Sequence, residues 1–133
     1  MSKKLWIPII VLLLFVVGAG VVLWQRTNAD IVVDQPVANS KISSPLTITG
    51  KAIGGWYFEA VFPIRLWNDK NELIAQTSGQ AQEDWMTDKQ VPFNAELEFP
   101  AQPAGTTGKL VFEKDNPSGL PQNAKSYSIK VRF

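Results

Sequence analysis

Residues 54–67 read GGWYFEAVFPIRLW and hold five aromatic side chains in fourteen positions. Successive side chains of a β-strand point to opposite faces, so residues two apart share a face. In one continuous strand, the first face is wholly apolar and comprises Trp56, Phe58, Ala60, Phe62, Ile64 and Leu66. The other face is mixed and comprises Tyr57, Glu59, Val61, Pro63, Arg65 and Trp67. The pattern therefore predicts a strand that packs most of these aromatic rings into a hydrophobic core.

Six further short runs alternate apolar and polar residues between clusters of Pro, Gly, Asn, Asp and Ser, which is typical of an all-β domain. The expected strands are 31–34, 46–52, 72–77, 91–99, 109–114 and 126–133. With 54–67 they make about seven strands, the scale of an immunoglobulin-like two-sheet sandwich. A small barrel is the alternative architecture. The disulfide-bonded variety of immunoglobulin domain is excluded, because the chain has no cysteine.

The N-terminal segment 5–24, LWIPIIVLLLFVVGAGVVLW, has no charged residue. A helix of this length spans roughly 30 Å, the thickness of the hydrocarbon core of a bilayer. Trp6 and Trp24 bracket the segment, and indole rings favour the headgroup level. We therefore expect a single-pass transmembrane helix within residues 1–29 and one β-sandwich domain over residues 30–133.

The charges around this segment predict its orientation. Lys3 and Lys4 precede it, whereas only Arg26 follows closely, so the N-terminus is expected in the cytoplasm and the domain outside the cell membrane. A cleaved signal peptide is the competing interpretation, because residues 27–29 loosely resemble a small-x-small cleavage site.

Composition excludes several classes of function. The formal net charge is +1, and no basic stripe with interleaved aromatic residues indicates nucleic acid. The chain has neither cysteine nor histidine, which excludes Ser–His–Asp and Cys–His catalysis and thiolate metal sites. The acidic loop 80–89 lacks the regular ligand order of a calcium motif. The sequence therefore predicts no catalytic residue, no metal site and no cofactor.

The candidate partner contacts are the polar and aromatic residues of the outer face together with one loop tryptophan. They are Tyr57, Glu59, Arg65, Trp67 and Trp85. Exposed Tyr, Trp and Arg are the residue types that anchor protein and sugar contacts. The alternative is structural, with Glu59 and Arg65 paired across strands and with Trp85 and Met86 folded back over one end of the sandwich.

Four blocks of the sequence resemble the immunoglobulin-like domain of bacterial spore germination proteins. They are SPLTITGKA (44–52), WYFEAVFPIRLWN (56–68), WMTDKQVPFNAELEF (85–99) and GKLVFEKDNPSG (108–119). The resemblance covers roughly residues 31 to 133. It implies a bacterial, exported, immunoglobulin-like sandwich that is non-catalytic, and it carries no active-site residue across.

We therefore expect a membrane-anchored extracytoplasmic module that binds or scaffolds. Its expected partner is another cell-envelope protein or a peptidoglycan-type glycan, with no nucleic acid. The alternative is a structural subunit of a spore germination or sporulation membrane complex.

Overall fold

The computed structural model describes residues 29–133, so the predicted span at 5–24 lies outside the described residues. Seven strands follow one another along the chain: β1 (Ile31–Gln35), β2 (Leu46–Ile53), β3 (Val61–Asn68), β4 (Leu73–Ala81), β5 (Gln90–Leu97), β6 (Thr107–Glu113) and β7 (Ser126–Arg132). The only helices between Ala29 and Phe133 are two short 3-10 turns, η2 (Gly54–Trp56) and η3 (Pro121–Asn123). Within that part of the chain, no helix has the length and apolarity needed to cross a bilayer.

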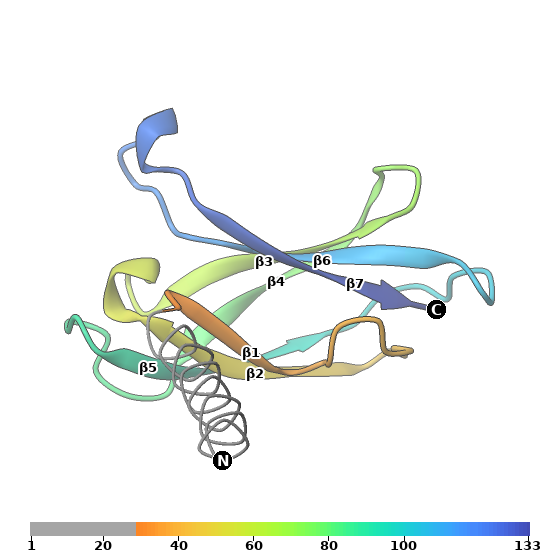
Figure 1. The fold of residues 1–133 in the computed structure, drawn as a ribbon, viewed down its shortest axis with the longest axis horizontal. Coiled ribbons are helices and arrows are strands. Elements are labelled where there is room, and N and C mark those ends of the chain that lie inside the picture. The colour runs from red at the N-terminus through yellow and green to blue at the C-terminus, as the bar shows by residue number, and fades with distance from the viewer. Residues whose placement is uncertain (1–28) are drawn as a thin grey trace, which may run out of the picture.

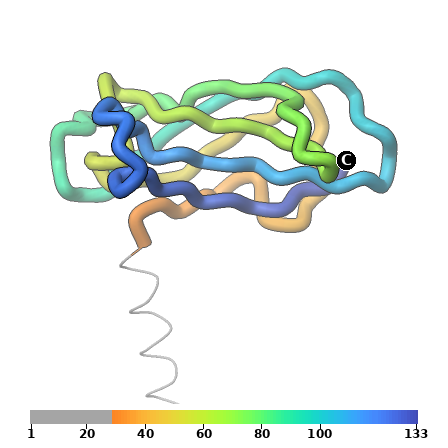
Figure 2. The backbone as a smooth tube through the Cα atoms, turned by 90° about the horizontal axis from the view of Figure 1, so that it is seen from above, coloured from red at the N-terminus to blue at the C-terminus, as the bar shows by residue number. Residues whose placement is uncertain are grey.

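The strands form one hydrogen-bonded sheet that bends into two layers (Figure 1). Its order is β1-β2-β5-β4-β3-β6-β7, and all neighbours are antiparallel. Figure 2 shows β3, β6 and β7 side by side along the domain. The layers join where β4 pairs with β5 at Gln80–Asn94 and Ala81–Phe93. On the other side, a bridge between Lys41 and Arg132 brings the β1–β2 connection beside β7. The all-β prediction with seven strands is confirmed, and the sheet is nearly closed.

The core lies between the two layers, and the residues that fill it alternate along the strands as expected for half-buried strands. Phe62 of β3 is fully buried and contacts Phe93 of β5 edge to face, with ring centroids 4.9 Å apart. Phe112 of β6 continues this aromatic row, 6.1 Å from Phe93. Because these rings come from both layers, they hold the layers together.

The stretch 54–67 departs from the predicted continuous strand. It begins with the 3-10 turn η2, and the chain then reverses at Glu59 and Ala60, whose φ angles are +51° and +68°. Phe58 and Val61 close this turn with two backbone hydrogen bonds of 2.9 and 3.2 Å. The predicted alternation holds from Val61 onward. Before the turn it holds at Trp56, which is buried, and is wrong at Phe58, which is 41% exposed.

Tyr57 is the clearest correction, because it lies in the core and not on the outer face where we expected it. Its side chain is only 4% exposed, and its hydroxyl donates a 2.7 Å hydrogen bond to the carbonyl of Val91. Burial raises the pKa of the Tyr57 phenol well above its ordinary value of 10.0, although a backbone hydrogen bond involving Ala52 opposes the shift. The phenol is therefore held neutral in the folded protein.

Two substitutions on either side of the turn at 58–61 test which phenylalanine ring is buried. We expect Phe62→Ala to lower the free energy of unfolding by about 3–5 kcal/mol, because it leaves a cavity in the aromatic row. Phe58→Ala should change it by about 0.5 kcal/mol or less, because that ring faces solvent. Denaturant unfolding followed by near-ultraviolet circular dichroism measures both. Equal losses would contradict the turn and restore the continuous strand.

The buried phenol predicts a pH effect. The phenol of Tyr57 ionises near pH 10 once unfolded, whereas burial keeps it protonated in the folded state. The unfolded state therefore loses its proton first, so stability falls as the pH rises above about 10. Tyr57→Phe should cost about 1 kcal/mol at neutral pH through the lost hydrogen bond.

This variant should also flatten the alkaline loss of stability relative to the unsubstituted protein. Tyr127→Phe is the control, since Tyr127 is 41% exposed. Unfolding free energies measured at several pH values between about 8 and 11 give the comparison. Identical alkaline slopes for Tyr57→Phe and the unsubstituted protein would contradict the burial of this phenol.

Candidate functional site

The structure does not bring the five predicted contact residues together. Tyr57 is in the core, and Glu59 lies exposed in the turn before β3. Arg65 and Trp67 lie half-buried on β3, and Trp85 lies half-buried in the β4–β5 connection. The expectation of one shared outer face was based on a continuous strand, and the turn at Glu59 and Ala60 breaks that strand.

Arg65 has a different charged neighbour from the one that we considered. Its guanidinium forms an ion pair with the carboxylate of Glu113 at the end of β6, not with Glu59. Both side chains keep about a third of their exposure to water. A partly exposed pair of this kind stabilises a fold by about 1 kcal/mol or less. Its main effect is that the Arg65 guanidinium is already paired and is less available for contact with a partner.

Trp85 is packed against the hydrophobic core, as the structural alternative anticipated. Its loop runs close to Gly54, where an added Cβ would lie 2.3 Å from the carbonyl oxygen of Trp85 and 1.8 Å from that of Thr87. Only glycine permits this approach, so Gly54 sets the position of the loop. The same alternative is wrong for Met86, which was expected to fold back with Trp85 but is 75% exposed.

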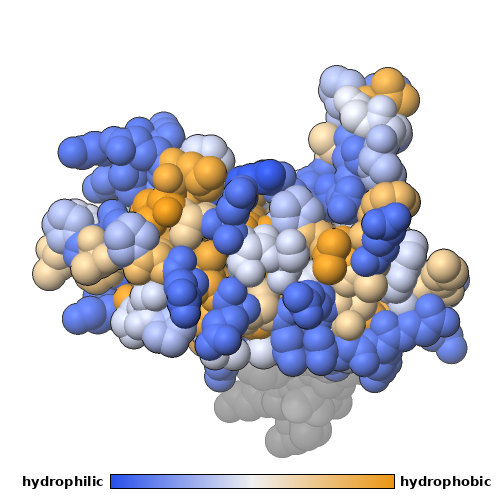
Figure 3. All heavy atoms as spheres, turned by 180° about the vertical axis from the view of Figure 1, so that it is seen from behind, coloured by the Kyte–Doolittle hydropathy of each residue, from blue (hydrophilic) through white to orange (hydrophobic). Residues whose placement is uncertain are grey.

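The space-filling view shows apolar side chains in small groups separated by hydrophilic ones (Figure 3). On this side of the molecule there is no continuous apolar platform over the described residues. Such platforms are the usual sign of a large hydrophobic interface. On this side of the molecule, polar side chains are therefore the better candidates for recognition of a partner.

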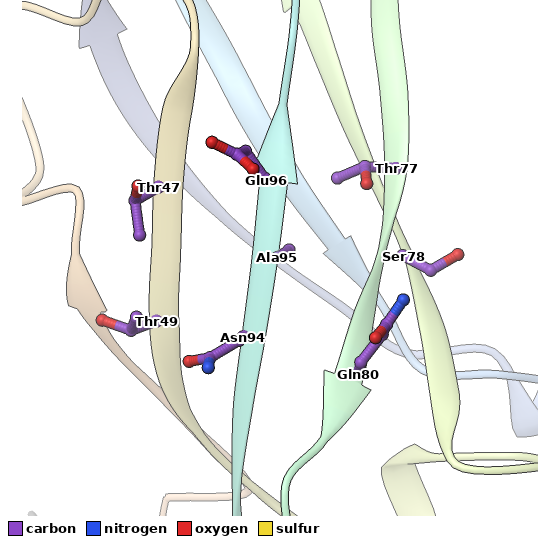
Figure 4. Close-up of a pocket in the computed structure, with 8 residues that line it drawn as sticks. All are labelled: Thr47, Thr49, Thr77, Ser78, Gln80, Asn94, Ala95 and Glu96. Atoms are coloured by element: carbon purple, nitrogen blue, oxygen red, sulfur yellow. The ribbon is translucent and has the colours of Figure 1, made fainter.

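A polar groove of about 520 Å³ lies where β4 and β5 separate (Figure 4). Three neighbouring strands contribute its lining: Thr47 and Thr49 from β2, Asn94, Ala95 and Glu96 from β5, and Thr77, Ser78 and Gln80 from β4. All of these residues but Ala95 are polar, and Glu96 alone is charged. The groove can therefore offer hydrogen bonds to an elongated polar molecule.

This groove was not predicted from the sequence. Its side chains belong to strands that we expected to be ordinary outward faces, and none of them is a residue type that announces a site. The one feature of the sequence that could have indicated the groove is a lack of charge, because ELIAQT (72–77) and the residues after it carry few charged side chains. The groove arises because β4 and β5, which follow one another in the chain, separate beyond the pair Gln80–Asn94.

Between Ala29 and Phe133, no group of three or more His, Cys, Asp or Glu side chains is placed to hold a metal ion. The buried phenol of Tyr57 is bonded to a backbone carbonyl in the core and does not reach the groove lining. The arrangement supports recognition of a partner by shape and hydrogen bonding.

Comparison with known proteins agrees with this architecture. No curated protein and no solved structure matches the chain. Residues 30–119, about two thirds of the chain, match the family described as the immunoglobulin-like domain of bacterial spore germination. The match covers the strands from β1 to β6. The chain therefore belongs to the immunoglobulin-like domain family of bacterial spore germination proteins.

Proposed function

We propose that the protein is a membrane-anchored, extracytoplasmic and non-catalytic module that binds another cell-envelope protein through the groove between β4 and β5. The groove is the observation that carries this proposal, because it is a concave polar surface that the three neighbouring strands β2, β5 and β4 line together. Immunoglobulin-like domains are generally binding modules. The groove, and not the fold, supports this function, since a fold alone does not imply one.

The placement of the chain entry supports access to the groove. The described residues begin at Ala29, whose carbonyl accepts a 2.6 Å hydrogen bond from Gln90 at the start of β5. An ion pair of 3.1 Å joins Asp30 to Lys125 before β7. These contacts fix the entry at the end of the sandwich where β4 ends and β5 begins. The groove opens toward the other end, away from the proposed membrane anchor.

The proposed anchor also limits the partner. Residues 25–29 separate the predicted span from the domain, and an extended segment of that length reaches roughly 17 Å. A domain held so close to the bilayer meets partners that are themselves near the membrane. A glycan is the weaker candidate at this groove, because its lining includes no aromatic ring on which a sugar can stack.

A structural subunit of a spore germination or sporulation membrane complex is the second candidate function. Membership of the spore germination domain family favours it. In that case the N-terminal segment itself makes contacts, whereas a binding module needs it only as a tether. Exchanging this segment therefore distinguishes the two.

We expect site-specific photocrosslinking in intact cells to separate these functions. A photoreactive residue at position 78, in the groove, should form a covalent adduct with an envelope protein. The same residue at position 118, an exposed loop position outside the groove lining, should form none. The groove adduct should persist when an unrelated single-span anchor replaces residues 1–26.

Loss of the adduct on anchor exchange, with normal membrane levels of the protein, would favour the complex subunit. A groove position that yields no adduct while position 118 yields one would contradict the proposed binding surface.

A further inference from the structure

We propose, on the basis of the proposed binding function, that the partner enters the groove as an extended polypeptide strand. This strand hydrogen-bonds to the free backbone edge of β4 and presents a Lys or Arg side chain to Glu96. The inference deepens the proposed function by naming the form of the partner.

The first observation is that β4 is paired along most of its length on one side only. Its order in the sheet is central, between β3 and β5. It pairs with β3 from Leu73 to Gln80, but with β5 only at Gln80 and Ala81. The segment 73–79 therefore has no ladder partner on its β5 side among the described residues. It behaves as an edge strand inside a nearly closed sheet.

The second observation is the direction of the backbone groups on β4. The amide of Ala81 donates to the carbonyl of Ala60 at 2.8 Å, and the amide of Gln82 donates to the carbonyl of Pro92 at 2.9 Å. The backbone amide and carbonyl groups of odd-numbered residues of β4 thus face β3, and those of even-numbered residues face β5. Backbone groups alternate in this way along a strand, so those of Gln76 and Ser78 point into the groove.

The third observation concerns the facing strand. Gln80 is opposite Asn94, so the next pair on that side in the same register would be Ser78 opposite Glu96. That pair is not formed, because the strands have already separated. The backbone groups of Glu96 consequently also point into the groove, by the same alternation. An inserted strand would find donors and acceptors on both walls.

The other edges of the sheet are protected, whereas this one is not. β1 contains Asp34 and an irregularity between Val33 and Gln35. β7 carries Lys130 and Arg132, and its edge receives hydrogen bonds from the 39–42 segment. Charges, bulges and covering segments are the usual means of blocking strand addition. β4, with the sequence LIAQTSGQA, has no charge and no proline.

The chemistry of the groove favours a peptide over other occupants. Glu96 is its one charged lining residue, so a basic side chain on the inserted strand would be complementary. Strand addition provides affinity through main-chain hydrogen bonds and specificity through alternate side chains. The hydroxyl and amide side chains around Glu96 suit the polar side chains of such a strand.

A second copy of the chain fits less well. In a two-fold pair, β4 of one copy would run antiparallel to β4 of the other. The two domains would then point in opposite directions along their long axes. Nine residues of β4 span about 30 Å, whereas residues 25–29 reach only about 17 Å. Two copies anchored in one membrane with their strands upright are therefore unable to pair in this way.

The test selects a phage-displayed library of random twelve-residue peptides against the full chain in detergent micelles. Enriched peptides should carry a Lys or Arg and should bind with a measurable Kd. Synthetic versions are then N-methylated at one amide after another. Because one edge of the peptide pairs along β4 and its other edge meets the β5 backbone only at Glu96, methylation should weaken binding by roughly tenfold at every second position. It should have little effect at the positions between them, apart from the one residue opposite Glu96.

Variants of the protein supply matched controls. Ser78→Pro should weaken peptide binding by roughly tenfold, since it removes an amide that faces the groove. Ser128→Pro on β7 is the control, because by the same alternation its amide also faces away from its ladder partner, and it should leave the Kd unchanged. Glu96→Gln should weaken basic peptides severalfold, whereas Glu98→Gln, outside the groove lining, should not.

Circular dichroism of each variant verifies that it is folded, and the N-methylation series needs no variant at all. Methylation effects without a period of two, or a Kd unaffected by Ser78→Pro, would overturn strand addition. A library that yields no binding peptide would overturn it as well. In either case a crosslinked adduct at position 78 would leave the broader proposed function standing.

Discussion

The distance between the two layers is the constraint on which the rest of the structure depends. Strands within a sheet lie about 4.8 Å apart, whereas packed layers lie about 10 Å apart. Phe62 and Phe93 fill the space between the layers, so β4 and β5 pair only at the join and then separate. Gly79 marks this place, since an added Cβ would lie 2.5 Å from the ring of Phe62. The groove is thus a consequence of the core.

This origin gives the groove two properties that suit recognition. Its walls are rigid strands, so the backbone groups of Ser78 and Glu96 are fixed before any partner arrives. Backbone groups that are already held in place lose less conformational entropy when a partner binds. The groove also lies away from the end where Ala29 and Asp30 are fastened by Gln90 and Lys125. In the proposed function, a domain anchored at this end would therefore keep its groove accessible to neighbouring envelope proteins.

The sequence predicted the strands well because their alternation is local. Residues from Phe62 to Leu66 show this, since burial and pattern agree at each position. The turn at Glu59 and Ala60 was missed, because neither residue is a type that favours positive φ. Tyr57 was consequently placed on the wrong face. The groove was missed for a different reason. β4 and β5 follow one another in the chain, but their pairing ends at Gln80 and Asn94 because of the packing between the layers, which no short sequence pattern encodes.

Amide hydrogen exchange along β4 measures whether this strand is unpaired on its β5 side, as the groove requires. Thr77 and Gly79 face β3, whereas Gln76 and Ser78 face the groove. In the protein without a bound partner, we expect slow exchange at the amides of Thr77 and Gly79 and fast exchange at those of Gln76 and Ser78. Uniform protection of all four amides would show that β4 is already paired on both sides and would contradict the account.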